Sequence, residues 1–123
     1  MKNPNDNFLQ GRIRSFKFAL RGAWLLIITE HSIMVQFSIA IIMTVVGFIV
    51  KLSIVEWMFQ IVAIGLVLVA ESLNTGIEKL ADFIHPDYHK KIGFVKDISA
   101  GAATFAAIIA VIIGLLIYIP KFS

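Results

Sequence analysis

The sequence predicts an all-α membrane protein in which an N-terminal surface helix precedes three transmembrane helices. The chain has 123 residues, of which 59% are hydrophobic and only 15% are charged, whereas an average soluble domain carries about 25% charged residues. Its mean hydropathy is +0.88. Three long apolar stretches explain this composition, and each is close to or above the length that crosses a hydrocarbon layer about 30 Å thick. We expect residues 1–123 to form a single domain.

The first predicted element is a basic amphipathic helix over about residues 8–28. This segment mixes aromatic and aliphatic side chains with four basic ones, which are Arg12, Arg14, Lys17 and Arg21. Such a mixture is typical of a helix lying in the membrane interface. The alternative that the residues leave open is a positively charged flank of the first span.

The three spans are predicted at about residues 33–50, 54–82 and 98–119. The first and third contain no charged residue, and the second carries Glu56 near its start and acids at its end. Polar residues 29–32 interrupt the apolar character before the first span, and residues 51–53 form a short turn. Pro86 ends the long second helix, because proline cannot continue the backbone hydrogen bonding.

The distribution of basic residues predicts the orientation. Nine of them precede the first span or lie from Lys79 to Lys96, and only Lys51 and Lys121 lie on the other side. This bias places the N-terminus and the connection between the second and third spans in the cytoplasm, and the C-terminus outside. We therefore expect a multi-pass protein of the cytoplasmic (inner) membrane. The chain has no cysteine, which excludes a disulfide framework or a thiolate metal site.

Four polar residues at the end of the second span form the candidate functional site. Glu71, Asn74, Glu78 and Asp82 fall within roughly 80° of one another around a helix and therefore share one face. Ionisable groups within a span are costly unless they are paired, hydrated or bound to metal. Glu71 lies about 21 Å along the helix from Trp57, inside the hydrocarbon layer, and Glu78 lies about 10 Å further, at the cytoplasmic interface.

The sequence lacks the motifs by which soluble proteins bind nucleotides or metals. It has no G-x-x-x-x-G-K-[S/T] loop, no G-x-G-x-x-G, no H-E-x-x-H and no nucleophile elbow. If the chain handles a nucleotide, it must use carboxylates with a hard cation and place basic side chains on the phosphates.

A longer signature points to a known family. The spacing E-x-x-N-x-x-x-E-x-x-x-D over residues 71–82, followed by residues 86–89 and 95–102, resembles the prokaryotic diacylglycerol kinase family, which includes the undecaprenol kinases. The resemblance covers nearly the whole chain. It implies a homotrimer with active sites shared between subunits, open to the cytoplasm, that transfers the γ-phosphoryl group of Mg-ATP to a lipid hydroxyl.

The resemblance also implies a role for individual residues. Glu71 is the general base for the lipid hydroxyl, and Asn74 orients that base or the hydroxyl. Glu30 and Glu78 hold the Mg²⁺, and Ala100 joins Glu71 at the lipid substrate. The implied ATP contacts are Arg12, Arg14, Phe18, Glu30, Glu78, Asp87, Tyr88, His89, Lys96 and Asp97.

Two acids also have structural interpretations. Asp82 is expected in a supporting role, paired with Lys79 or with a neighbouring subunit. Asp97 is a candidate cap for the third helix, a role compatible with nucleotide contact.

Two departures from the best-known diacylglycerol kinase pattern concern the substrate. Gln36 replaces an acid, and Ala100 replaces a serine. Both changes favour undecaprenol over diacylglycerol and leave the proposed base and metal ligands intact.

Two other classes of function stay open on the residues. One is a small ion or proton-coupled transporter, whose carboxylates we would expect near the midplane of the membrane. The other is a non-catalytic membrane assembly protein, for which the small residues Ala106, Ala110 and Gly114 of the third span would suffice.

Overall fold

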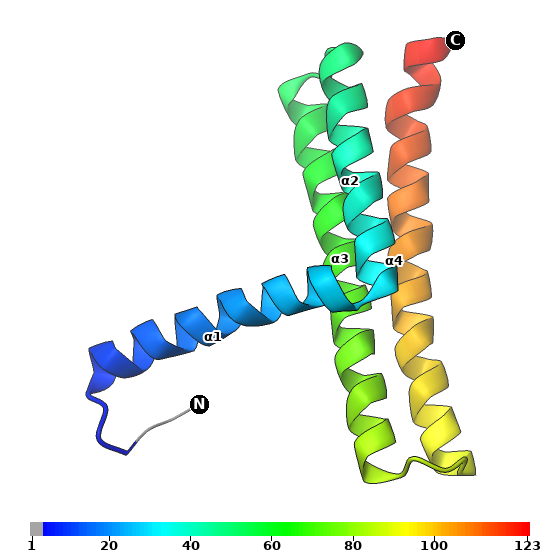
Figure 1. Cartoon of the computed structure of the whole chain (residues 1–123). Coiled ribbons are helices and arrows are strands. Elements are labelled where there is room, and N and C mark those ends of the chain that lie inside the picture. The colour runs from blue at the N-terminus through cyan, green and yellow to red at the C-terminus, as the bar shows by residue number, and fades with distance from the viewer. Residues whose placement is uncertain (1–3) are drawn as a thin grey trace.

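The computed structural model describes residues 4–123 and is entirely helical over this range apart from short connections. Its four helices are α1 (Phe8–Thr29), α2 (His31–Ile49), α3 (Ile54–Ile84) and α4 (Lys90–Phe122). Figure 1 shows α2, α3 and α4 running side by side as a bundle, while α1 leaves the bundle at a steep angle. The all-α prediction is therefore confirmed.

Three of these helices are long and apolar enough to cross a membrane. They are α2 with 19 residues, α3 with 31 and α4 with 33. Their length and composition are those of the spans of a multi-pass membrane protein. The first two spans agree closely with the predicted ranges. The third helix is longer than predicted, because it begins at Lys90 and not near residue 98.

The early start of α4 is explained by its cap. The side chain of His89 accepts a hydrogen bond from the backbone N–H of Lys91 at 3.1 Å, which satisfies one of the free donors at the helix start. Asp97 lies well inside α4, so its predicted capping role is wrong. The connection between α3 and α4 shrinks to residues 85–89, which we call the loop end of the bundle.

A break of a single residue separates α1 from α2. Glu30 has an extended backbone, with φ −106° and ψ 115°, between two helices, and it lies within the interruption predicted at residues 29–32. No residue of α1 is buried. The other end of α1 is fixed by Asn7, whose side chain accepts from the N–H of Gln10 at 2.8 Å in a capping box.

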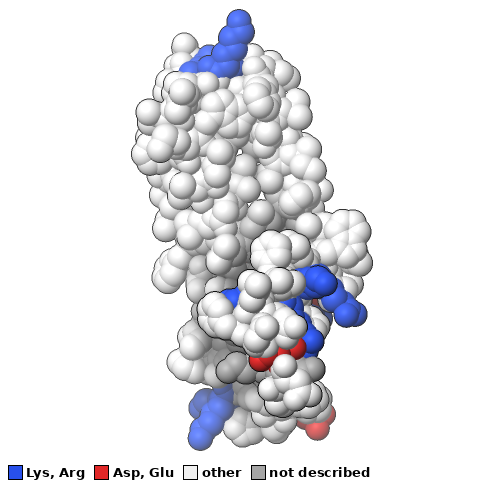
Figure 2. All heavy atoms as spheres, turned by 90° about the vertical axis from the view of Figure 1, so that its left-hand side faces the viewer, with Lys and Arg blue, Asp and Glu red and all other residues white. Residues whose placement is uncertain are grey.

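The helix lengths determine how far the bundle extends beyond α2. At 1.5 Å per residue, the 19 residues of α2 span about 28 Å, close to the thickness of a hydrocarbon core, whereas the 31 residues of α3 span about 46 Å. The last turns of α3 and the first turns of α4 therefore project past the start of α2 (Figure 1). Figure 2 shows charged side chains in the lower half of the molecule and basic ones at its upper tip, with an uncharged zone between them.

The opposite end of the bundle, at residues 50–53, is held by close contacts between α2 and α3. Gly47 approaches Trp57 so closely that a Cβ added at Gly47 would lie 2.6 Å from the indole ring. The same ring packs on Phe48, with centroids 4.8 Å apart. Lys121 of α4 pairs with Glu56 of α3 at 2.9 Å.

One polar network links all three helices of the bundle. The side chain of Gln60 is only 5% exposed; it donates to the carbonyl oxygen of Met43 at 3.0 Å and accepts from the hydroxyl of Tyr118. Because both polar ends of the amide are paired, its burial carries little penalty. Most apolar residues of the bundle nevertheless stay exposed, so lipid or further protein must cover them.

Candidate active site

The four polar positions at the end of α3 lie on the side of the helix that faces α4. Glu71 and Asn74 line a cavity whose other residues all come from α4, and Asp82 pairs with Lys96 of α4. The side-chain amide of Asn74 lies 3.4 Å from a carboxylate oxygen of Glu78. The structure thus places the predicted stripe at the interface between two helices.

The cavity at Glu71 joins a polar end to apolar walls. It has a volume of about 510 Å³ and is lined by Glu71, Asn74, Ala100, Ala103, Thr104, Ala107, Ile108, Val111 and Ile112. Six of these nine side chains are apolar, and the polar ones are Glu71, Asn74 and Thr104. A molecule with one polar group and a hydrocarbon tail matches this division. We call this space the head cavity.

Two buried polar atoms near the head cavity lack a partner. Among the described residues, the Oδ1 atom of Asn74 and the Oγ atom of Ser99 are buried without a hydrogen bond. A buried acceptor without a partner is costly in a finished fold. Asn74 thus offers an oxygen to a ligand, a cation or a second chain.

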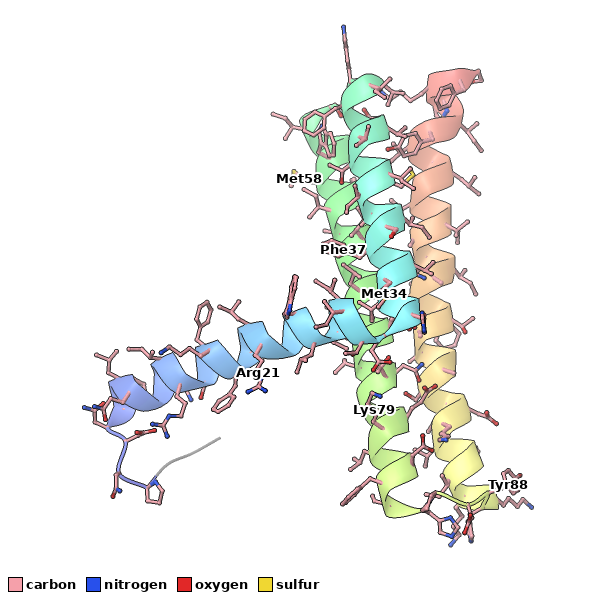
Figure 3. The ribbon with its side chains drawn as sticks, in the orientation of Figure 1. Arg21, Met34, Phe37, Met58, Lys79 and Tyr88 are labelled. Carbon is pink, nitrogen blue, oxygen red and sulfur yellow. The ribbon has the colours of Figure 1, made fainter. Side chains whose placement is uncertain are left out.

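Glu30 is brought to α3 from a distant part of the sequence. Its carboxylate pairs with Lys79 at 3.0 Å, so it lies beside the turn of α3 that also carries Glu78. Figure 3 labels Lys79 on α3 near the junction of α1 and α2. The ion pair explains how a residue between two helices is held against a third.

This arrangement fits the donor set that Mg²⁺ uses. Magnesium is commonly bound by one or two carboxylates, with phosphate oxygens and waters completing its octahedron. Glu30, in the break between α1 and α2, and Glu78, on α3, are the two carboxylates that would serve, and Asn74 has a buried amide oxygen without a hydrogen bond. Within residues 4–123 no group of three or more acids or histidines gathers in one chain, so a cation held here needs ligands from its substrate.

The partner of Asp82 differs from the prediction. Asp82 pairs with Lys96 of α4, whereas Lys79, one of its two predicted partners beside a neighbouring subunit, is held by Glu30. The difference arises because α4 starts earlier than predicted and brings Lys96 alongside the end of α3. Asp97 follows Lys96 on the same helix.

The predicted nucleotide contacts at residues 87–89 lie at the loop end. Tyr88 is 88% exposed and points away from the bundle in Figure 3. The Nδ1 atom of His85 lies 2.6 Å from the carbonyl oxygen of Asp87. These residues face solvent about 20 Å beyond Glu71 along α3, so the structure leaves them apart from the head cavity.

The predicted contacts on α1 also lie apart from the head cavity of the same chain. Arg14 pairs with Asp6 at 3.0 Å, and the guanidinium of Arg12 lies 5.8 Å from the centroid of the Phe8 ring. Phe18 is exposed. All three residues belong to α1, which projects away from α3 and α4 (Figure 1).

Several lining residues were missed in the sequence. Thr104, Ala107 and Val111 face the head cavity together with Ala100. From Ala100 onward these residues follow one another at steps of four, three and four, a pattern that the sequence shows and that places them on one helix face. Lys79 was also missed as the partner of Glu30, and no local pattern indicates a pair so distant in sequence.

Comparison with known proteins gives one consistent result. The model of the family described as prokaryotic diacylglycerol kinase matches residues 17–118. The undecaprenol kinase of Bacillus subtilis (strain 168) is 40% identical over 115 residues, which are 94% of each chain. The diacylglycerol kinase of Escherichia coli (strain K12) is 30% identical over 93 residues, covering 76% of this chain and 74% of that one. With this match over most of its length, the chain belongs to the prokaryotic diacylglycerol kinase family and is a lipid kinase.

Proposed function

We propose that this lipid kinase transfers the γ-phosphoryl group of ATP to the hydroxyl of a membrane lipid, with Mg²⁺, at the cytoplasmic membrane interface. Undecaprenol is the favoured substrate and diacylglycerol a close second. The observation that carries the proposal is the head cavity, where Glu71 and Asn74 stand at the polar end of an apolar space. A lipid alcohol likewise has a polar hydroxyl at one end and an apolar hydrocarbon chain.

Glu71 is the proposed general base. It takes the proton of the lipid hydroxyl as that oxygen bonds to the γ-phosphorus, while the bond from the γ-phosphorus to the bridging oxygen breaks and releases ADP. The amide of Asn74 orients the hydroxyl or the carboxylate. Positioning and charge neutralisation supply most of the catalysis in phosphoryl transfer, so no covalent enzyme intermediate is required.

Glu30 and Glu78 are the proposed holders of Mg²⁺, which neutralises negative charge on the ATP phosphates when it is bound. Lys79 holds the Glu30 carboxylate against α3. It would keep Glu30 in place before the cation arrives. Lys96 and Asp97 lie at the same end of the bundle as residues 87–89 and are proposed to contact the nucleotide.

The outward direction of α1 supports shared active sites. Arg12, Arg14 and Phe18 belong to α1, which leaves its own bundle, so we propose that they serve the ATP site of a neighbouring subunit in a homotrimer. In this arrangement α1 lies on the cytoplasmic surface as an amphipathic helix. The N-terminus is then cytoplasmic and the C-terminus lies outside.

Support for undecaprenol comes from two sources. Ala100 lines the head cavity, where it presents a methyl group at the position of a serine in the diacylglycerol kinase pattern. The relative named undecaprenol kinase matches more of the chain, at higher identity, than the relative named diacylglycerol kinase.

The test is a phosphorylation assay with purified protein in mixed micelles. Labelled ATP is supplied with undecaprenol or with diacylglycerol, in parallel, with and without Mg²⁺. We expect Mg²⁺-dependent label in undecaprenyl phosphate, and less label in phosphatidic acid at equal lipid content. Transfer that proceeds equally in a metal chelator would contradict the magnesium role, and preference for diacylglycerol would reverse the substrate assignment.

A further inference from the structure

A second cavity lies inside the bundle, between α2, α3 and α4. Its volume is about 370 Å³. We call it the tail cavity, and its lining residues are Gln36, Ile39, Ala40, Met43, Gln60, Ala63, Ile64, Val67, Leu68, Ala107, Ala110, Val111, Ile113, Gly114, Ile117 and Tyr118. Apart from three polar side chains, this lining is apolar.

The tail cavity adjoins the head cavity. Ala107 and Val111 of α4 line both spaces. On α3, Val67 of the tail cavity lies one turn before Glu71 of the head cavity, on the same helix face. The two cavities therefore adjoin along the α3–α4 interface. We call the pair of cavities the track; it begins at the proposed base and leads away from the loop end.

The track has a definite far end. Gln60 and Tyr118 line it there, and their hydrogen bonds to each other and to Met43 join the three helices. From Ala100 to Tyr118 the track follows α4 for about 27 Å, which is nearly the thickness of the hydrocarbon layer.

The tail cavity is open because small residues line it. Ala40, Ala63, Ala107 and Ala110 contribute only methyl groups, and a Cβ added at Gly114 would meet no atom within 4 Å. Two positions depart from the diacylglycerol kinase pattern. One is Gln36, which lines the tail cavity, and the other is Ala100, which lines the head cavity. Both substrate-related positions thus face the track.

From these observations we propose that the tail cavity receives the hydrocarbon tail of the lipid alcohol whose hydroxyl lies at Glu71. The inference rests on the proposed function and adds a specificity determinant to it. A single track suits a lipid with one tail, such as a polyprenol, because the second tail of diacylglycerol would have to leave it. The tail moves from one apolar medium, the surrounding lipid, into another, the tail cavity. The free energy of binding therefore comes from packing and alignment, and hydrophobic transfer contributes little.

Filling the tail cavity tests this inference by chain length. Gly114→Leu places a side chain into the tail cavity. Gly65→Leu is the matched control, because a Cβ at Gly65 also meets no atom within 4 Å. Gly65 lines neither cavity. Each variant is assayed with undecaprenol and with geraniol, whose short chain stays near the head cavity. We expect Gly114→Leu to lower kcat/KM for undecaprenol about five- to tenfold while the value for geraniol changes less than twofold.

The ratio of kcat/KM for undecaprenol to kcat/KM for geraniol, measured on one variant, separates a change in specificity from a loss of folded protein. Loss of structure in Gly114→Leu would lower both values together, and photo-crosslinking of the wild-type protein then decides. An unchanged undecaprenol value would show that no tail passes Gly114 and would overturn the inference. Gly65→Leu should leave the ratio at its wild-type value.

Photo-crosslinking tests occupancy without relying on catalysis. A polyprenol with a diazirine midway along its tail should label the lining positions Ala110, Gly114 and Tyr118, and Gly114→Leu should reduce that label. Label confined to outward residues of α4, such as Leu115 and Leu116, overturns the inference. Correct labelling without phosphoryl transfer to any lipid would instead refute the proposed function and leave the tail site standing.

Discussion

Glu71 stands at the boundary between two environments. On one side it contacts the apolar walls of the head cavity. On the other side, Asn74 and Glu78 follow one and two turns further along α3 and contact each other. Counted from the start of α3, Glu71 is close to the level at which α2 begins, which is about one hydrocarbon thickness from the opposite end of the bundle. A lipid hydroxyl can reach this depth while its tail stays in the membrane.

Replacing the proposed base should remove the reaction and spare the fold. We expect Glu71→Gln to lower phosphorylation of undecaprenol at least about 100-fold, because loss of a general base costs two to four orders of magnitude. The control is Glu56→Gln at the other end of α3, where glutamine can still complete the capping box with Ser53. Both variants should elute as the wild-type oligomer, and normal activity in Glu71→Gln would refute the base assignment.

Replacing a proposed metal holder should change the dependence on magnesium. We expect Glu78→Gln to raise the Mg²⁺ concentration for half-maximal activity at least about tenfold, because one of two carboxylates is lost. Asp82→Asn is the matched control, since Asp82 is the next acid of the stripe and pairs with Lys96. If both substitutions shift the magnesium curve equally, the effect reflects general charge and the ligand role of Glu78 is wrong.

The sequence could identify the residues of the candidate site but not all of their contacts. Helical periodicity placed Glu71 and Asn74 on one face, and the structure shows both lining one cavity. Helical periodicity could not predict which lysine pairs with which acid, because the pairs Glu30–Lys79 and Asp82–Lys96 join different segments of the chain. Such pairs depend on how the helices are aligned in the bundle, which hydrophobic runs do not specify.

At the scale of the elements, the least predictable feature was the start of α4. Hydropathy marks where a helix enters the apolar layer, near residue 98, but the polar first turns from Lys90 onward carry no such signal. Their helical state depends on the His89 cap and on contact with the end of α3 through Lys96. The spans could thus be predicted from composition, whereas the projection of α3 and α4 beyond them follows from capping and pairing.

The contact between α2 and α3 near Gly47 gives a prediction about stability. A methyl group at Gly47 would lie 2.6 Å from the Trp57 ring, so Gly47→Ala must displace a ring that also packs on Phe48. We expect a loss of about 1–3 kcal/mol in the free energy of unfolding, as overpacking typically costs.

Unfolding in mixed micelles with increasing denaturing detergent measures this loss. Gly65→Ala is the control, because its Cβ meets no atom within 4 Å and alanine favours the helix. Equal stability of the two variants would show that the Trp57 ring moves aside freely.

At the scale of the whole molecule, a single chain leaves much apolar surface exposed. No residue of α1 is buried, and most apolar residues of the three spans are exposed. Lipid can cover much of this surface. Helix α1 also leaves the bundle at a steep angle (Figure 1), and in the proposed homotrimer a neighbouring subunit would lie beside it.

Mixing two inactive variants tests whether sites are shared between subunits. Glu71→Gln removes the proposed base, and a chain with both Arg12→Ala and Arg14→Ala removes the proposed α1 contacts. If each site combines α1 of one subunit with Glu71 of another, mixed oligomers contain sites in which both parts are intact. With equal amounts and random assembly, roughly a quarter of all sites should be restored.

The measurement is phosphorylation after the two purified variants are unfolded together, refolded together and assayed with labelled ATP. Each variant refolded alone provides the background. As a control, the α1 variant is mixed with a chain that carries the α1 changes and Glu71→Gln together, in which no pairing restores a complete site. Activity that stays at background in the first mixture, although both variants assemble, would place the whole site within one chain; α1 would then have to fold back from the direction seen in Figure 1 to reach its own ATP.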